Sequence, residues 1–281
     1  MKKYRLIRKI LIYIFLSATA LVMLYPLIWL FGASFKSNPE IFSSLWFMPE
    51  KFDFSSYIKG WNTSGSYNMG HYFINTFKIV LPKTAFSVIS SVITAYGFAR
   101  FEFPLKKFLF SVLIISMIIP ETILRIPSYK LWKAFGMLDT YVPLTLPSLF
   151  AYEGIFVFML VQFLKGIPRE LDDAAKIDGC NSFQTLFFIL VPCMKPAVIS
   201  VGVFTFLWSM NEFLEPLIFI SSVEKYPLSL AVRMSMDSTG QGYEWSSIIS
   251  MSFIGLIPSV LVFLAAQKYF VSGISSSGIS G

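Results

Sequence analysis

Four residues near position 210 place an aromatic ring beside carboxylates and an amide within an apolar run. Trp208, Asn211, Glu212 and Glu215 recur at i, i+3, i+4 and i+7, a spacing that lies on one face of a continuous helix. An aromatic ring covers the apolar C–H face of a sugar, while carboxylates and amides hydrogen-bond its hydroxyls. The pattern therefore indicates a path for a sugar-like solute, although polar side chains at a helix interface within a bilayer would give the same pattern.

Three further ionisable residues, Glu121, Arg125 and Glu153, also lie within apolar runs. Ionisable groups at membrane depth are costly and usually face a bundle interior or a water-filled cavity. Glu121 precedes Arg125 by four residues, the favourable order for an ion pair on a helix. We expect either a structural pair that neutralises itself or an arginine that lines the path and helps to bind the solute. Glu153 is a further candidate for the path.

The composition indicates the elements that must position these groups. Of the 281 residues, 55% are hydrophobic and only 14% are charged, against about 25% charged in an ordinary soluble domain. A membrane-spanning helix needs about 20 mostly apolar residues. The fold class expected is therefore an all-α polytopic membrane protein with six transmembrane helices in one domain over 1–281. The spans are expected at about 10–33, 77–99, 108–127, 141–164, 196–220 and 245–266.

The N-terminus carries a basic cluster ahead of the first span. Lys2, Lys3, Arg5, Arg8 and Lys9 precede an apolar run without a charge before Lys36, which is too long for the core of a cleavable signal peptide. By the positive-inside rule this cluster places the N-terminus in the cytoplasm, and six crossings return the C-terminus there. The net charge of +7 is thus an orientation signal and gives no indication of nucleic-acid binding.

The segment between the fourth and fifth expected spans, 165–192, reads as a short helix, a sharp turn and another helix at the membrane surface. Pro168 suits the first position of a helix, acidic residues follow where the helix dipole favours them, and Gly179 can end the helix in a left-handed conformation. From the residues alone the segment is either a simple connector or an element that docks into a partner's groove.

The stretch Asp173-Ala-Ala-x3-Gly179-x9-Ile189-x-Val191-Pro192 resembles the EAA loop of bacterial ABC importer permeases, whose consensus is Glu-Ala-Ala-x3-Gly-x9-Ile-x-Leu-Pro. Here Asp173 replaces the consensus Glu and Val191 the consensus Leu. Stretches 95–104, 208–217 and 270–274 also resemble the carbohydrate permease subunits of the maltose-type, or MalG-like, branch. The resemblance covers most of the chain.

The resemblance implies that the helices of the loop insert into a cleft on a cytoplasmic ATPase. ATPase-coupling residues are then expected at Glu170, Asp172, Asp173, Ala174, Ala175, Asp178, Gly179 and Pro192. The sequence contains no Gly-x4-Gly-Lys-Ser/Thr phosphate loop, so ATP and Mg²⁺ would be used by a separate ATPase subunit. We expect a transport subunit and not an enzyme, with no catalytic residue, metal site or cofactor of its own. The Gly- and Ser-rich tail, 272–281, is expected to be flexible.

The resemblance implies one permease subunit of a binding-protein-dependent ABC importer that moves an oligosaccharide or related sugar across the bacterial cytoplasmic membrane by alternating access. The partners it implies are a second, different permease subunit, a homodimeric cytoplasmic ATPase and an extracytoplasmic solute-binding protein, in contact with membrane lipid and without nucleic acid. The alternatives are a permease for another polar solute, such as glycerol phosphate or an acidic saccharide, and an ion-driven secondary transporter.

Overall fold

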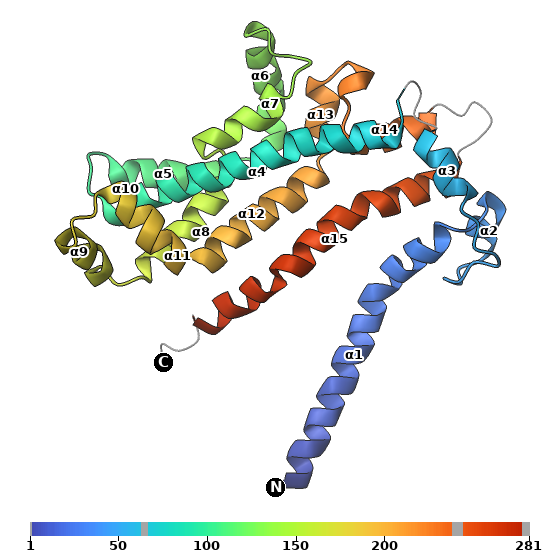
Figure 1. Ribbon diagram of the computed structural model, residues 1–281, viewed down its shortest axis with the longest axis horizontal. Coiled ribbons are helices and arrows are strands. Elements are labelled where there is room, and N and C mark those ends of the chain that lie inside the picture. Colours follow the sequence, from blue (N-terminus) through green and yellow to red (C-terminus); the bar gives the residue numbers. More distant parts are fainter. Residues whose placement is uncertain (1, 63–66, 238–243, 277–281) are drawn as a thin grey trace. The chain divides into compact units, whose positions relative to one another are not determined.

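The computed structural model describes residues 2–62, 67–237 and 244–276, and within these ranges it describes the side chains of residues 4 to 269. Within those ranges the chain is helical and contains no strand (Figure 1). Its contacts divide it into two compact units, one formed by Met1–His71 with Ala231–Ile257 and the other by Tyr72–Leu230 with Pro258–Gly281.

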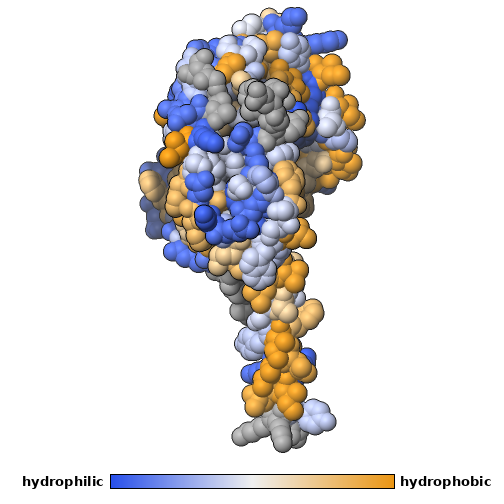
Figure 2. Space-filling view, turned by 90° about the vertical axis from the view of Figure 1, so that its right-hand side faces the viewer, coloured by the Kyte–Doolittle hydropathy of each residue, from blue (hydrophilic) through white to orange (hydrophobic). Residues whose placement is uncertain are grey.

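Among the described residues, three helices lie wholly within the first unit, and parts of other helices belong to it. Its helices are α1 (Lys2–Ala33), α2 (Asn38–Ser43) and α3 (Ser55–Asn62), joined by parts of α14 (Leu228–Asp237) and α15 (Trp245–Ser276). Helix α1 exposes apolar side chains along its length, as the narrow column in Figure 2 shows. A surface of this kind is suited to lipid or to another apolar helix.

The loop after α1 is held by buried polar groups. Lys36 is fully buried, and its Nζ donates to the carbonyl oxygens of Ser44 at 3.2 Å and Trp46 at 2.5 Å. The carbonyl oxygen of Ser34 accepts hydrogen bonds from the hydroxyls of Ser56 at 2.9 Å and Ser250 at 3.0 Å. These bonds satisfy polar groups that would otherwise be costly to bury, and they join α1, α3 and α15.

The second unit contains the remaining elements. They are α4 (Met69–Arg100), α5 (Lys106–Ser116), α6 (Glu121–Ala134), α7 (Val142–Thr145), η1 (Leu146–Phe150), α8 (Gly154–Lys165), α9 (Glu170–Ile177), α10 (Ser182–Gln184), the π-helical turn η2 (Thr185–Leu190), α11 (Val191–Cys193), α12 (Lys195–Met210), α13 (Leu214–Phe219) and η3 (Val223–Lys225).

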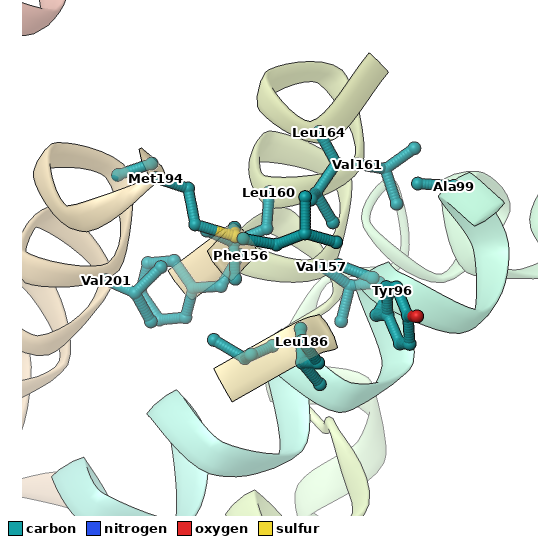
Figure 3. Close-up of a cluster of buried hydrophobic side chains, with 14 residues drawn as sticks. Tyr96, Ala99, Phe156, Val157, Leu160, Val161, Leu164, Leu186, Met194 and Val201 are labelled. Carbon is teal, nitrogen blue, oxygen red and sulfur yellow. The ribbon is translucent and has the colours of Figure 1, made fainter. Parts of the chain in front are cut away.

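The core of this unit lies where α4, α8, η2 and α12 meet. Figure 3 shows side chains from all four elements pointing toward one another. Val157 and Leu160 of α8 are fully buried in it, together with Ala95 of α4, Leu190 of η2 and Val201 of α12. Burial of such side chains contributes about 1.5–3 kcal/mol each, so this cluster holds the ends of the helices around it in fixed positions.

Four segments of the described chain are long and apolar enough to cross a membrane, and the number rises to six if each of two bent helix pairs forms one span. The third expected span, 108–127, is not one helix: α5 and α6 meet at an angle of 103°. Pro120 lies at the break, and a proline within a helix lacks the N–H donor and clashes with the preceding turn.

The fourth and fifth expected spans are interrupted as well. In 141–164 the helix breaks between Phe150 and Gly154, where Ala151 has a φ of 53°. In 196–220, α12 ends at Met210 and α13 begins only at Leu214. The last helix runs beyond 266 to Ser276, so it includes the first five residues of the tail expected to be flexible; 277–281 lie outside the described residues.

Candidate functional site

The breaks in these helices border a cavity of about 660 Å³ in the second unit. It lies between α4, the junction of α5 and α6, the start of α8 and the end of α12. Five of the seven residues expected on the path line it, and Lys83 of α4 joins them. These residues are Lys83, Glu121, Glu153, Trp208, Glu212 and Glu215.

The carboxylates of the cavity lie at or just before the starts of helices. Glu121 is the first residue of α6, Glu153 immediately precedes α8, and Glu215 is in the first turn of α13. Glu212 lies in the loop before α13, and its Oε1 accepts from the backbone N–H of Glu215 at 3.3 Å. A helix N-terminus has unsatisfied N–H groups and a positive dipole end, which stabilise negative charge among apolar helices.

Glu153 is held at the back of the cavity by hydroxyl groups. Ser148 donates to its Oε1 at 2.8 Å and Ser87 to its Oε2 at 3.3 Å. The hydroxyl of Thr205 donates in turn to that of Ser87 at 3.3 Å. This buried network fixes the orientation of the carboxylate.

Lys83 and Glu215 form an ion pair, with Nζ 3.4 Å from Oε2, and both side chains are largely buried. Close by, the hydroxyl of Ser209 is buried without a hydrogen-bond partner and lines the same cavity. Neither Lys83 nor Ser209 is among the seven path residues expected from the sequence, although Lys83, with Arg125, leaves an anionic cargo possible. A lysine near the end of a span is ordinary, and serine is common in membrane helices, so only their tertiary positions distinguish them.

Trp208 supplies the aromatic surface of the cavity. Its ring stacks on that of Phe156, with centroids 5.2 Å apart and an interplanar angle of 21°, and about half of its surface remains exposed. An indole ring held on one side and open on the other can pack against an apolar face of a ligand.

Two expected path residues do not line the cavity. Asn211 is the first residue after α12, and its amide donates to the carbonyl oxygen of Leu207 at 2.7 Å. The assumption that it shares one helical face with Trp208, Glu212 and Glu215 is wrong, because α12 ends before it. Arg125 is also outside the lining. Within the described residues no ion pair joins it to Glu121, so the structural pair expected from their spacing does not form.

Segment 165–192 forms a helix, a turn and a further helical stretch, as its residues indicate. The position expected for Pro168 is wrong, because α9 begins at Glu170 and Arg169 is its N-cap. Helix α9 is followed by Gly179 with a φ of 81°, a conformation that favours glycine. Asn181 then caps α10 by a reciprocal capping box with Gln184, whose backbone N–H and side chain both take part at 2.9 Å.

Helix α9 has one face directed to the protein and one open to solvent. Asp172 and Ala175 are buried, and Arg100 Nε of α4 lies 3.0 Å from Asp172 Oδ2. Asp172 and Ala175 therefore hold α9 in place, and their expected part in ATPase coupling stays a prediction. The other expected coupling residues are exposed to solvent: Glu170, Asp173, Ala174, Asp178, Gly179 and Pro192.

Comparisons with known proteins identify relatives along the whole chain. The model of the family described as "Binding-protein-dependent transport system inner membrane component" matches residues 87–276. The arabinooligosaccharides transport system permease protein AraQ of Bacillus subtilis is 30% identical over 276 residues, which cover 97% of this chain and 96% of that protein. The galactooligosaccharides transport system permease protein GanQ of the same organism is 27% identical, with 100% and 99% covered.

The fold is also that of a solved structure. A chain from the crystal structure of a bacterial ABC transporter involved in the import of the acidic polysaccharide alginate superposes with a TM-score of 0.80, at 21% identity and with 94% of this chain and 96% of that chain covered. The family match, the relatives and the apolar helices all indicate a membrane component of a transport system. The chain belongs to the binding-protein-dependent transport system inner membrane component family, as a multi-pass membrane protein.

Proposed function

We propose that this chain is one permease subunit of an ATP-driven ABC importer that carries an oligosaccharide or a related sugar across the bacterial cytoplasmic membrane. The observation that carries the proposal is the 660 Å³ cavity, in which Trp208 meets carboxylates and Lys83 among apolar helices. Its relatives AraQ and GanQ are permease proteins named for oligosaccharide transport, which supports this class of cargo.

The mechanism is alternating access, in which the sugar remains chemically unchanged. An extracytoplasmic binding protein delivers the sugar, and closure of the ATPase dimer reverses the side on which the cavity opens. The four long apolar segments and two bent pairs support six spans. The basic cluster before the first span supports a cytoplasmic N-terminus, and an even number of spans returns the C-terminus to the same side. The breaks at the cavity bring polar groups to interruptions of apolar segments, which supports a solute path like that at the broken helices of other transporters.

Helix α9 is the element that couples this movement to the ATPase. Its open face presents carboxylates and the largely exposed side chain of Ile177, a combination that suits insertion into a groove on a partner. Its buried face is tied to α4 through Asp172, so a force on α9 is transmitted to a membrane helix. ATP and Mg²⁺ are bound by the separate, homodimeric ATPase, and a second, different permease subunit completes the pathway.

The charge of the cavity favours a neutral cargo. Four carboxylates face one lysine, and that lysine is already paired with Glu215. An anion entering this site would meet like charges in a medium of low dielectric constant, where repulsion is strong. Glycerol phosphate and acidic saccharides are therefore the less favoured alternatives.

The test is uptake by the complete assembly in ATP-loaded proteoliposomes with its binding protein. Neutral oligosaccharides should be taken up in preference to acidic ones, and Trp208→Ala should lower uptake about tenfold, which corresponds to ~1.4 kcal/mol. Trp208→Phe keeps an aromatic ring and should retain most of the activity. Unchanged uptake by Trp208→Ala would exclude the cavity as the path, and loss of assembly would assign Trp208 to an interface instead. Abolition of uptake by an uncoupler would support an ion-driven transporter.

A further inference from the structure

A second cavity, of about 1260 Å³, lies in the same unit, where the C-terminal ends of α4 and α8 meet the start of α5. It is separate from the proposed sugar path and shares no lining residue with it. Its lining contains five basic side chains and two acidic ones. The basic side chains are Arg100, Lys106, Lys107, Lys165 and Arg169, and the acidic ones are Glu102 and Glu170.

The positive charge of this cavity is only partly neutralised. Lys106 Nζ lies 2.8 Å from Glu102 Oε1, and Arg100 is paired with Asp172. In the described part of the chain, no ion pair involves Lys107, Lys165 or Arg169. The excess of positive charge in the cavity favours an anionic ligand, because the basic side chains repel one another until a counter-charge binds.

The wall of the cavity is aromatic as well as basic. Phe103, Phe108 and Phe110 line it, and Lys165 Nζ lies 5.6 Å from the centre of the Phe110 ring. Beyond the cavity, α5 exposes Leu109 and Val112 along an apolar helix. A basic pocket thus continues into an apolar surface that begins at the ends of membrane-crossing helices.

We propose that this cavity binds the headgroup of an anionic phospholipid, with the acyl chains lying along the exposed apolar side of α5. The phosphodiester would accept from Lys107 and Lys165, and a lipid is the anion that also satisfies the adjacent apolar surface. Basic pockets between membrane helices are known to bind lipid headgroups in this way. The proposal concerns a different cavity from the sugar path and does not depend on the identity of the cargo.

The experiment measures lipid retention by the purified complete assembly. The assembly is placed in nanodiscs of phosphatidylcholine mixed with phosphatidylglycerol, and the lipids that remain bound after release into the gas phase are counted by native mass spectrometry. Wild type should retain phosphatidylglycerol selectively. The double variant Lys107→Gln/Lys165→Gln should lower its occupancy about tenfold, since each lysine near a membrane surface strengthens the attraction for an anionic lipid.

Two variants make the result specific. Lys130→Gln/Lys133→Gln removes the same charge from α6, away from the cavity, and should leave retention unchanged. Lys107→Arg/Lys165→Arg keeps the charge and should keep the lipid. Equal retention of both lipids by wild type, or unchanged phosphatidylglycerol in the glutamine variant, would overturn the proposal. Displacement of the lipid by soluble glycerol phosphate alone would also overturn it, because the apolar contacts would then contribute nothing.

Discussion

The guanidinium of Arg100, the last residue of α4, forms an ion pair with Asp172 on α9, and the two side chains are only 7% and 12% exposed. Arg100 also donates from Nη2 to the carbonyl oxygen of Ile167 at 2.9 Å. A helix of eight residues is too short to be stable by itself. The orientation of α9 therefore depends on this pair and on the buried Ala175.

Arg100→Gln should release α9. Removing one partner of a buried ion pair leaves an uncompensated charge and typically costs about 3–5 kcal/mol, so thermal unfolding of the purified assembly should shift to a lower temperature and sugar-stimulated ATP hydrolysis should fall. The control is Lys176→Gln on the same helix, whose pair with Asp173 is largely exposed and should matter by less than about 1 kcal/mol. Equal unfolding temperatures for the two variants would contradict a structural role of the Arg100–Asp172 pair.

The Lys83–Glu215 pair is open to a double-mutant cycle. Lys83→Met leaves Glu215 without its cation in a largely buried site and should destabilise the assembly by roughly 1–3 kcal/mol. Lys83→Met/Glu215→Gln removes both charges and should recover part of that loss. Denaturation of the single and double variants measures the coupling. If the free-energy losses of Lys83→Met and Glu215→Gln, measured separately, add up to that of the double variant, the interaction between the two residues contributes nothing to stability.

Asp139 ties the loop after α6 to the segment after α13. Its Oδ1 accepts from the backbone N–H groups of Ser221 at 3.0 Å and Ser222 at 2.8 Å, and its Oδ2 lies 2.9 Å from Lys225 Nζ. Burial acts to raise the pKa of the Asp139 carboxyl, but the hydrogen bonds from Lys225, Ser222 and Ser221 outweigh it and hold the pKa well below its ordinary value.

A lowered pKa in the folded state means that the unfolded chain binds the proton more readily. The stabilisation by Asp139 is therefore complete above the pKa of the unfolded carboxyl, about 3.9, and is lost as the pH falls further. Asp139→Asn should unfold at a lower temperature than wild type at neutral pH, and this difference should narrow progressively below about pH 5. Thermal unfolding of both proteins across this range is the measurement. A difference that stays constant with pH would show that the charge of Asp139 is not responsible.

Gly32 lies against the backbone of Phe47, in the loop after α2 in the first unit. A Cβ added there would lie 1.6 Å from the carbonyl oxygen of Phe47, so the backbone itself would have to move. Gly32→Ala should destabilise by at least about 1–3 kcal/mol, as overpacking does. Gly97→Ala is the matched control, because a Cβ at Gly97 meets nothing within 4 Å and alanine favours a helix by roughly 0.5–1 kcal/mol. Similar unfolding temperatures for the two variants would contradict the close packing at Gly32.

Much of the architecture follows from the order of residues along the chain. Runs of apolar residues determine which segments enter a membrane, because the cost of burying polar groups there is large. The acids at 170–173 and Gly179 determine the helix and turn at 170–179, because capping is local, whereas Pro168 lies before the helix and is not its first residue. The family that the resemblance of 173–192 to the EAA loop indicates is confirmed by the family match over 87–276.

The composition of the path is less predictable, since it depends on where helices end. Trp208, Glu212 and Glu215 reach one cavity although α12 stops at Met210. These three residues share the cavity as expected, but they do not share one face of a continuous helix, because α12 ends before Glu212. Asn211 lies outside the lining, because α12 ends before it. Arg125 also lies outside the lining, although it is on the same helix as Glu121.

The sequence by itself determined the membrane class, the family and the local form of segment 165–192, because each depends on hydrophobicity or on residues a few positions apart. Only the tertiary structure decided that Lys83 pairs with Glu215, that Asp172 is turned inward to Arg100, and that Lys107 and Lys165 share one basic cavity. The residues of each pair are separated by 58 to 132 positions along the chain. Their proximity therefore depends on how whole helices pack, and no local sequence pattern predicts it.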